Sequence, residues 1–122
     1  MKTVAVIGAS NNRRKFGNKA VRGFEAQGYK VVPISSHEAR IEGISAYRSV
    51  LDVPYQIDMA TIYVPSASGI EILDEIVEKK IPEVWINPGA DSPDMLQKAY
   101  KLGIEPIVAC SLVAIGEMPG DG

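Results

Sequence analysis

The segment Thr3–Ile7 (Thr-Val-Ala-Val-Ile) is a mostly β-branched run that is broken by Gly8. A strand with one face in water alternates apolar and polar residues, whereas this run offers no polar face. It therefore predicts a strand buried on both faces. Such strands belong to parallel sheets that helices cover on both sides, so this one segment already favours an α/β fold.

The rest of the chain alternates further strand patterns with helical ones. Strands are expected at Lys30–Ile34, Asp58–Val64, Glu83–Asn87 and Ile104–Ala109, with Ile44–Tyr47 as a candidate edge strand. One helix is expected to open at Gly17 or Asn18 and to stop at Gly28, and a single helical turn is expected at Ser49–Val53. Further helices are predicted from about Gly69 to Lys80 and from the cap Ser92-Pro93-Asp94 to Gly103.

Strands separated by helices imply right-handed parallel crossovers. The sequence thus predicts a three-layer, Rossmann-like, doubly wound α/β domain over residues 1–115, with a loose tail at 116–122. With the edge strand included, the strand order would be 3-2-1-4-5-6, and the chain would reverse direction between the strands that end at Ile7 and Val64. Ligands bind such sheets at this switch point, which places the segments Gly8–Gly17 and Tyr63–Ser68 beside one cleft.

Composition excludes several classes of function. The 122 residues carry 13 Lys and Arg against 15 Asp and Glu, a net charge of −2, so a generic nucleic-acid or membrane-surface binder is not expected. One Cys excludes an internal disulfide, and with one His it leaves little support for a metal site. The chain shows no targeting segment and no apolar stretch of membrane-spanning length, so we expect a cytoplasmic protein.

The loop after the first strand has the properties of a phosphate site. Gly8, Ala9 and Ser10 are small enough for a ligand to approach the backbone, and the following helix aims its N-terminal amides at the same place. Arg13, Arg14 and Lys15 form the densest basic run of the chain. Any one of these cations could equally be a solvent-exposed loop residue or a phosphate contact. As a group, they favour a pyrophosphate site.

The pattern disfavours NAD as the ligand. The next glycine after Gly8 is Gly17, so the loop is not the dinucleotide fingerprint, and no acid stands at the end of the second strand. That place reads Pro33-Ile34-Ser35-Ser36-His37, and Glu38 is expected to lie too far along. Ser35, Ser36, His37 and Arg40 could instead hold a ribose phosphate, a group that both NADP and coenzyme A (CoA) carry.

Several segments resemble the CoA-binding domain family, small proteins similar to the N-terminal domain of the succinyl-CoA synthetase alpha subunit. The resemblance covers about Thr3 to Leu112. It rests on Val4-Ala5-Val6-Ile7-Gly8-Ala9-Ser10, Gly28-Tyr29-Lys30-Val31-Val32-Pro33-Ile34 with Glu42-Gly43, Ile62-Tyr63-Val64-Pro65-Ser66, and Trp85-Ile86-Asn87-Pro88-Gly89, with Cys110 after the last strand.

The resemblance implies a Rossmann-like module that binds CoA or an acyl-CoA and has no known reaction of its own. Pyrophosphate contacts would come from Gly8, Ala9, Ser10, Lys15, Phe16 and Gly17, with Arg14 beside them. Ribose-phosphate contacts would come from Pro33, Ile34 and Ser35, and adenine contacts from Val64 and Pro65. Two departures stand out, because Ser35-Ser36-His37 replaces the Asn-Pro-Lys of many members and Asn87 replaces a common Gln.

Other functions stay open beside CoA binding. One is an NADP-type oxidoreductase on a minimal Rossmann domain, and another is a regulatory subunit of a separate acyl-CoA ligase, with an exposed apolar patch as its sign. A homodimer or another protein partner is compatible with either.

His37 is either an exposed loop residue, which we favour, or a phosphate contact. Cys110 is expected to be a buried apolar residue, with a mixed disulfide to CoA as the alternative.

Overall fold

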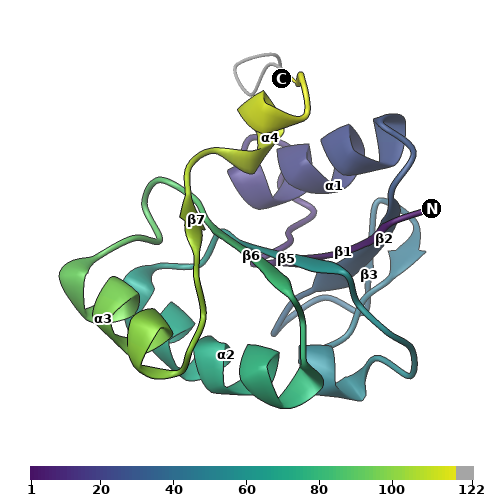
Figure 1. Ribbon diagram of the computed structural model, residues 1–122. Coiled ribbons are helices and arrows are strands. Elements are labelled where there is room, and N and C mark those ends of the chain that lie inside the picture. The colour runs from purple at the N-terminus through teal and green to yellow at the C-terminus, as the bar shows by residue number, and fades with distance from the viewer. Residues whose placement is uncertain (118–122) are drawn as a thin grey trace.

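The strand β1 (Thr3–Ile7) lies inside a parallel sheet of five strands in the order β2-β1-β5-β6-β7. The computed structural model describes residues 1–117. The other strands of this sheet are β2 (Lys30–Ile34), β5 (Met59–Ile62), β6 (Glu83–Ile86) and β7 (Ile107–Val108). The helices α1 (Phe16–Ala26) and α4 (Ser111–Ala114) cover one face; α2 (Ser66–Lys79), α3 (Pro93–Lys101) and the 3-10 turn η1 (Val50–Asp52) cover the other (Figure 1).

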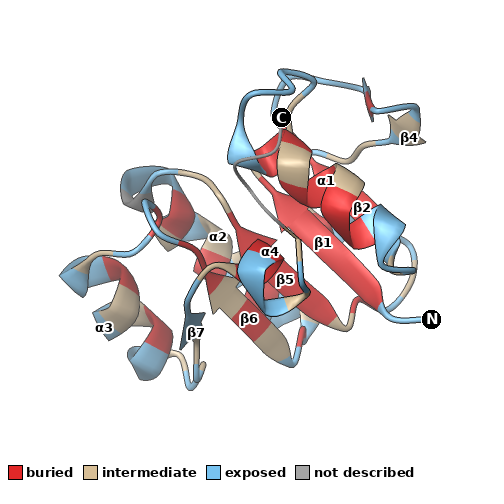
Figure 2. Cartoon of the chain, turned by 90° about the horizontal axis from the view of Figure 1, so that it is seen from above, coloured by how far each residue is buried: buried red, intermediate tan, exposed pale blue. Residues whose placement is uncertain are grey.

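The predicted burial of β1 on both faces is confirmed (Figure 2). Successive side chains of a strand point to opposite faces, so alternate residues enter different cores. Val6 belongs to the buried cluster that contains Phe24 of α1, whereas Ile7 belongs to the cluster that contains Leu73 of α2. The fold is the predicted three-layer α/β sandwich, and β1 is the strand on which its two cores meet.

The first residues of the three longer helices show where the local sequence is enough to predict a helix start. The predicted cap of α3 is confirmed, because the Ser92 hydroxyl accepts the Met95 N–H at 3.0 Å and Pro93 is the first helical residue. The helix α1 begins at Phe16, one residue before the predicted Gly17, and α2 begins at Ser66, three residues before Gly69. In both places the helix begins without a side-chain cap, which removes the sequence signal that marked α3.

The expected edge strand at Ile44–Tyr47 is wrong in extent. A separate antiparallel hairpin joins β3 (Arg40–Ile41) to β4 (Ile44–Ser45), and only Tyr47 pairs with the sheet, through one parallel bridge to Ile34. The Pro33 carbonyl accepts the Tyr47 N–H at 3.0 Å. In a parallel strand the nitrogen and oxygen of one residue face the same neighbour, so proline, which lacks an N–H, cannot extend this ladder.

The last strand is also shorter than predicted. Ile104 does not begin it, because its N–H closes the end of α3 by donating to the Ala99 carbonyl at 2.8 Å. Pro106 then has no N–H to offer, and only Ile107 and Val108 pair with β6. The helix α4 follows directly and was not predicted, since four residues are too few to show a helical period.

The C-terminal boundary lies partly outside the described residues. Residues 118–122 of the predicted loose tail are not described. Glu117, just before them, donates its N–H to the Leu112 carbonyl at 2.9 Å and accepts the Gln27 side-chain amide at 2.7 Å. Among residues 1–117, no helix has the length and apolar character needed to cross a membrane.

A close contact between two glycines positions α1 on the sheet. A Cβ built on Gly17 would lie 2.0 Å from the backbone oxygen of Gly8. Gly8 itself has φ +94°, and a Cβ there would lie 2.9 Å from Cγ1 of Val64. The start of α1, the end of β1 and the segment after β5 can therefore approach each other only because both positions lack a side chain.

We predict that Gly17→Ala lowers the free energy of unfolding by about 2–3 kcal/mol, because the new methyl group displaces backbone rather than a mobile side chain. Urea unfolding followed by circular dichroism measures it. Gly69→Ala is the matched control. Its Cβ would meet Cε of Met95 at 2.8 Å, a flexible side-chain end, and alanine favours the helix, so we expect a change within about 1 kcal/mol. Equal losses in both variants would contradict this account of the glycine contact.

Candidate functional site

A cleft of about 760 Å³ opens where β1, β2 and β5 end, at the predicted switch point of the sheet. Its walls include most of the residues that the sequence predicts for a nucleotide site: Gly8, Ala9, Ser10, Lys15, Phe16, Gly17, Ile34, Ser35, His37, Val64 and Pro65. Two of the residues expected from the family resemblance do not line it. Pro33 is buried within β2, and Arg14 is exposed on the loop with its N–H held by Oδ1 of Asn12 at 3.1 Å.

The loop between β1 and α1 is tied to the sheet at its beginning. The N–H groups of Gly8 and Ala9 both donate to the Ile34 carbonyl, each at 3.1 Å. They are therefore occupied within the protein. The Ser10 hydroxyl accepts the Asn12 N–H at 3.0 Å. The small residues at 8–10 thus shape the floor of the cleft, while their hydrogen-bonding groups largely serve the loop itself.

The start of α1 is the part of this loop that remains open to a ligand. Lys15 stands at the N-cap with extended backbone and makes no side-chain cap, and Phe16 and Gly17 follow on the cleft wall. The first N–H groups of an α-helix have no acceptor within the helix and carry a partial positive charge. The Asn18 N–H already donates to the Lys15 carbonyl at 3.1 Å, so the N–H groups left for a ligand at this end of the cleft are those of Phe16 and Gly17, next to Lys15.

The predicted basic run is divided by the fold. Arg13 leaves the cleft and pairs with Glu42, whose Oε2 lies 3.8 Å from the arginine Nε. The same carboxylate accepts the Asn18 side-chain amide at 3.0 Å, and Asn18 also donates to the Ser10 carbonyl at 2.8 Å. Glu42 sits in the β3–β4 turn with φ +50°, followed by Gly43 with φ +79°. The hairpin thus supports the loop between β1 and α1 from outside the cleft, and of the three cations only Lys15 lines the cleft.

The end of β2 forms the opposite wall. Ser35 is buried, and its hydroxyl accepts the N–H groups of His37 and Glu38 at 3.2 and 3.1 Å. This turn presents Ser36, His37 and Glu38 to the cleft. The expectation that Glu38 lies too far along is wrong, because the turn folds it back. Arg40, a predicted phosphate contact, donates instead to the Gly43 carbonyl at 2.8 Å and does not line the cleft.

Arg48 also lines the cleft beside this turn, although it was not predicted from the sequence. Its place follows from its neighbour Tyr47, whose carbonyl accepts the Ser35 N–H at 2.9 Å. The candidate edge strand at Ile44–Tyr47 could have indicated this. A strand that pairs with β2 brings the residue after it, Arg48, to the carboxyl end of β2. Ile72 of α2 and Ser68 complete the wall near Val64.

A buried polar network lies behind the β5 side of the cleft. The Ser111 hydroxyl is 2.8 Å from the Thr61 hydroxyl and 2.9 Å from that of Tyr63, and its N–H donates to Oδ1 of Asn87 at 2.9 Å. The Asn87 amide donates to the Thr61 hydroxyl at 2.6 Å. Burial raises the pKa of Tyr63 to about 12, so its hydroxyl stays neutral at any physiological pH. Asn87 is buried in this network rather than on the cleft wall.

The remaining residues singled out by the sequence lie away from the cleft. Cys110 precedes α4, is partly buried, and packs against the cluster that contains Phe24. It is not among the described residues that line the cleft. Trp85 packs against the same cluster and donates its indole N–H to Glu83 at 2.8 Å. That bond, with the Lys2 ammonium group, holds the pKa of the Glu83 carboxyl below its usual value.

Comparison with known proteins identifies the family. Residues 2–116 match the family model described as CoA binding domain. Over 84 residues the chain is 39% identical to the alpha subunit of acetate–CoA ligase (ADP-forming) II from Pyrococcus furiosus, and over 89 residues it is 38% identical to 4-hydroxybutyrate–CoA ligase (ADP-forming) from Nitrosopumilus maritimus. These matches cover 68% and 70% of this chain but only 18% and 12% of the two ligases.

Solved structures give the same answer for the fold. A conserved hypothetical protein from Pyrococcus furiosus superposes with a TM-score of 0.86 at 31% identity, covering 93% of this chain and 99% of that one. A dinucleotide-forming acetyl-coenzyme A synthetase from Candidatus Korarchaeum cryptofilum shares the fold at 24% identity, with a TM-score of 0.77, over 88% of this chain and 25% of that one. The resemblance read from the loop and strand motifs is therefore confirmed, and the chain belongs to the CoA-binding domain family.

Proposed function

We propose that the protein binds CoA, or an acyl thioester of CoA, in the cleft at the ends of β1, β2 and β5, and that it acts as a binding or regulatory module without a reaction of its own. The observation that carries this proposal is the open start of α1, where Lys15, Phe16 and Gly17 line a cleft in a chain of this family. An anion fits that place better than any other chemical group.

The pyrophosphate of CoA would lie at the start of α1. The N–H groups of Phe16 and Gly17 and the Lys15 ammonium group would supply hydrogen bonds and positive charge together. Gly8 and Ala9 would contribute differently from what the resemblance implies. Because the Ile34 carbonyl already accepts their N–H groups, they would give the ligand room rather than hydrogen bonds.

The adenine would lie against the apolar wall after β5. Val64 and Pro65 line this part of the cleft, with Ile72 of α2 behind them. Val64 and Ile72 are also packed against the buried cluster that contains Leu73, so this wall is supported from the core. An aromatic ring placed there would lose contact with water without leaving a polar protein group unsatisfied.

Two observations support a binding role over a catalytic one. The titratable side chains on the described cleft wall are Lys15, His37, Glu38, Arg48 and Tyr63, and no hydrogen bond of the described residues joins two of them into an acid–base pair. Tyr63, the one hydroxyl donor of the set, is bonded to Ser111.

The first test compares ligands by thermal unfolding. We expect CoA and acetyl-CoA to stabilise the protein, because a ligand present at 100 times its Kd adds about 2.7 kcal/mol, which raises Tm by about 10 °C in a domain of this size. NAD should leave Tm unchanged. A shift with NADP but not with CoA would contradict the proposal and favour the oxidoreductase, and no shift with any nucleotide would contradict both.

The charge at α1 is tested by a matched pair of variants. Lys15→Gln should weaken CoA binding about fivefold to tenfold in calorimetric titration, since it removes a charge-assisted contact to phosphate. Arg14→Gln removes the same charge from the adjacent residue, which is exposed and outside the cleft, and should change the Kd less than twofold. Equal effects of the two variants would show that only the overall charge of the loop matters.

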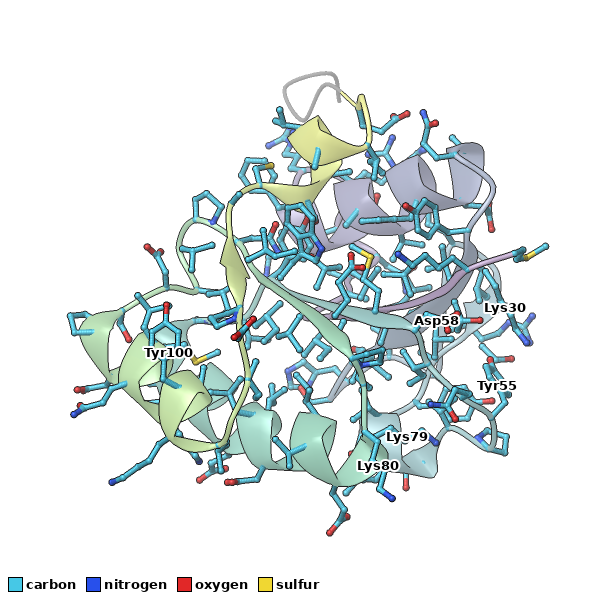
Figure 3. The ribbon with its side chains drawn as sticks, in the orientation of Figure 1. Lys30, Tyr55, Asp58, Lys79, Lys80 and Tyr100 are labelled. Carbon is cyan, nitrogen blue, oxygen red and sulfur yellow. The ribbon has the colours of Figure 1, made fainter. Side chains whose placement is uncertain are left out.

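A protein partner is the second candidate, favoured by apolar side chains at the β7 edge of the sheet. Ile107 and Val108 are 40% and 45% exposed, and Val113 of α4 is 61% exposed. Figure 3 shows Tyr100, also exposed, on α3 beside this edge. The matched acetate–CoA ligase chain from Pyrococcus furiosus is itself named as a subunit.

Self-association is the form of this second candidate that the protein alone can test. If the edge joins two copies, sedimentation velocity should show a dimer that Val108→Glu converts to the monomer, because a buried carboxylate without a partner is costly. A monomer in both proteins at high concentration would exclude self-association through this edge.

A further inference from the structure

We infer that Arg48 recognises the phosphate on the ribose of CoA and is the residue that makes the cleft prefer CoA to dephospho-CoA. This inference rests on the proposed CoA binding and assigns one residue within it. The role was expected from Ser35, Ser36, His37 and Arg40 at the end of β2. The contacts of Arg40 and Ser35 favour Arg48 instead.

The backbone fixes Arg48 beside the end of β2. The preceding residue, Tyr47, donates its N–H to the Pro33 carbonyl at 3.0 Å and accepts the Ser35 N–H at 2.9 Å. These two hydrogen bonds form the parallel bridge to Ile34. Arg48 therefore leaves the sheet next to the turn that holds His37, and both residues line the cleft.

Two of the expected residues, Arg40 and Ser35, make contacts within the protein, and so does Arg13 of the basic run. The Arg40 guanidinium donates to the Gly43 carbonyl at 2.8 Å within the β3–β4 hairpin, and Arg40 does not line the cleft. Arg13 pairs with Glu42. Ser35 is buried, and its hydroxyl accepts two N–H groups of its own turn. Ser35 is thus a positioning residue that shapes the turn.

The charges of the cleft match the charges of CoA. Among the described residues that line it, the permanently charged cations are Lys15, at the start of α1, and Arg48, at the end of β2. CoA carries two separate phosphate groups, a pyrophosphate and a ribose phosphate monoester, whereas dephospho-CoA and NAD carry the pyrophosphate alone. Lys15 would then neutralise charge on the pyrophosphate, and Arg48 would neutralise charge on the ribose phosphate.

Arginine suits this position chemically. A phosphate monoester is close to a dianion at neutral pH and offers three acceptor oxygens, which the planar guanidinium group can meet with two parallel N–H donors. Ser36 and His37 lie on the same wall and can add hydrogen bonds. Glu38 is on that wall too, and its carboxylate would repel the phosphate, so a strong cation is needed to make the wall favourable.

The test measures the Kd of CoA and of dephospho-CoA by calorimetry for the wild-type protein, Arg48→Gln, Arg48→Lys and Arg40→Gln. We expect the wild-type protein to bind CoA at least about tenfold more tightly than dephospho-CoA, the difference of one charged hydrogen-bonded contact. Arg48→Gln should reduce that ratio to less than about threefold by weakening CoA alone, and Arg48→Lys should keep an intermediate ratio. Arg40→Gln, which removes an arginine outside the cleft, should leave the ratio unchanged.

The outcomes separate this inference from the proposed function. If the wild-type protein prefers CoA and Arg48→Gln keeps that preference, or weakens both ligands equally, the assignment of Arg48 is wrong while CoA binding stands. A collapse of the ratio in Arg40→Gln instead would return the role to Arg40. If the wild-type protein binds neither ligand, the proposed function fails and the inference fails with it. Arg48 and Arg40 are both exposed, so the variants should fold, and an unchanged Tm without ligand checks this.

Discussion

The contact between Gly17 and Gly8 is the constraint on which the rest of this structure depends. With no side chain at either position, the first turn of α1 rests on the carbonyl end of β1, and the end of β1 rests against Val64 after β5. A side chain at position 17 would force α1 away from the sheet. The same contact therefore stabilises the packing of one core and places the first residues of α1 on the cleft wall. The stability of the fold and the shape of the candidate site therefore depend on the same close approach of two backbone segments.

The two sides of the cleft are built by different means. On the β5 side, a buried network that includes Thr61, Tyr63, Asn87 and Ser111 satisfies its members with each other, so this side is rigid and electrically neutral. On the β2 side, exposed turn residues carry the charge and are held only through backbone hydrogen bonds and the Ser35 hydroxyl. This division suits a ligand with an apolar ring at one place and phosphates at another.

Much of this architecture was predictable because its signals are local. The all-apolar Thr3–Ile7 run, the Ser92 cap and the small residues at 8–10 each encode their own environment. The remainder depends on contacts between distant segments. Arg48 reaches the cleft through the pairing of Tyr47 with β2, and Arg13 leaves it because Glu42 lies opposite in a hairpin. The Ser35 hydroxyl holds its own turn and Asn87 lies in a buried network, and both arrangements follow from partners that no spacing in the sequence reveals.

Bound as proposed, CoA would occupy the cleft between the start of α1 and the end of β2. Amide chemical shifts of the isotope-labelled protein, recorded with and without CoA, test it most directly because they report on each residue separately. Binding there should give large changes at Phe16 and Gly17, at the turn that holds His37, and at Arg48, with little change at β7 and α3, none of whose residues lines the cleft. Changes centred on α3 and β7, with the α1 start and Arg48 unmoved, would contradict it.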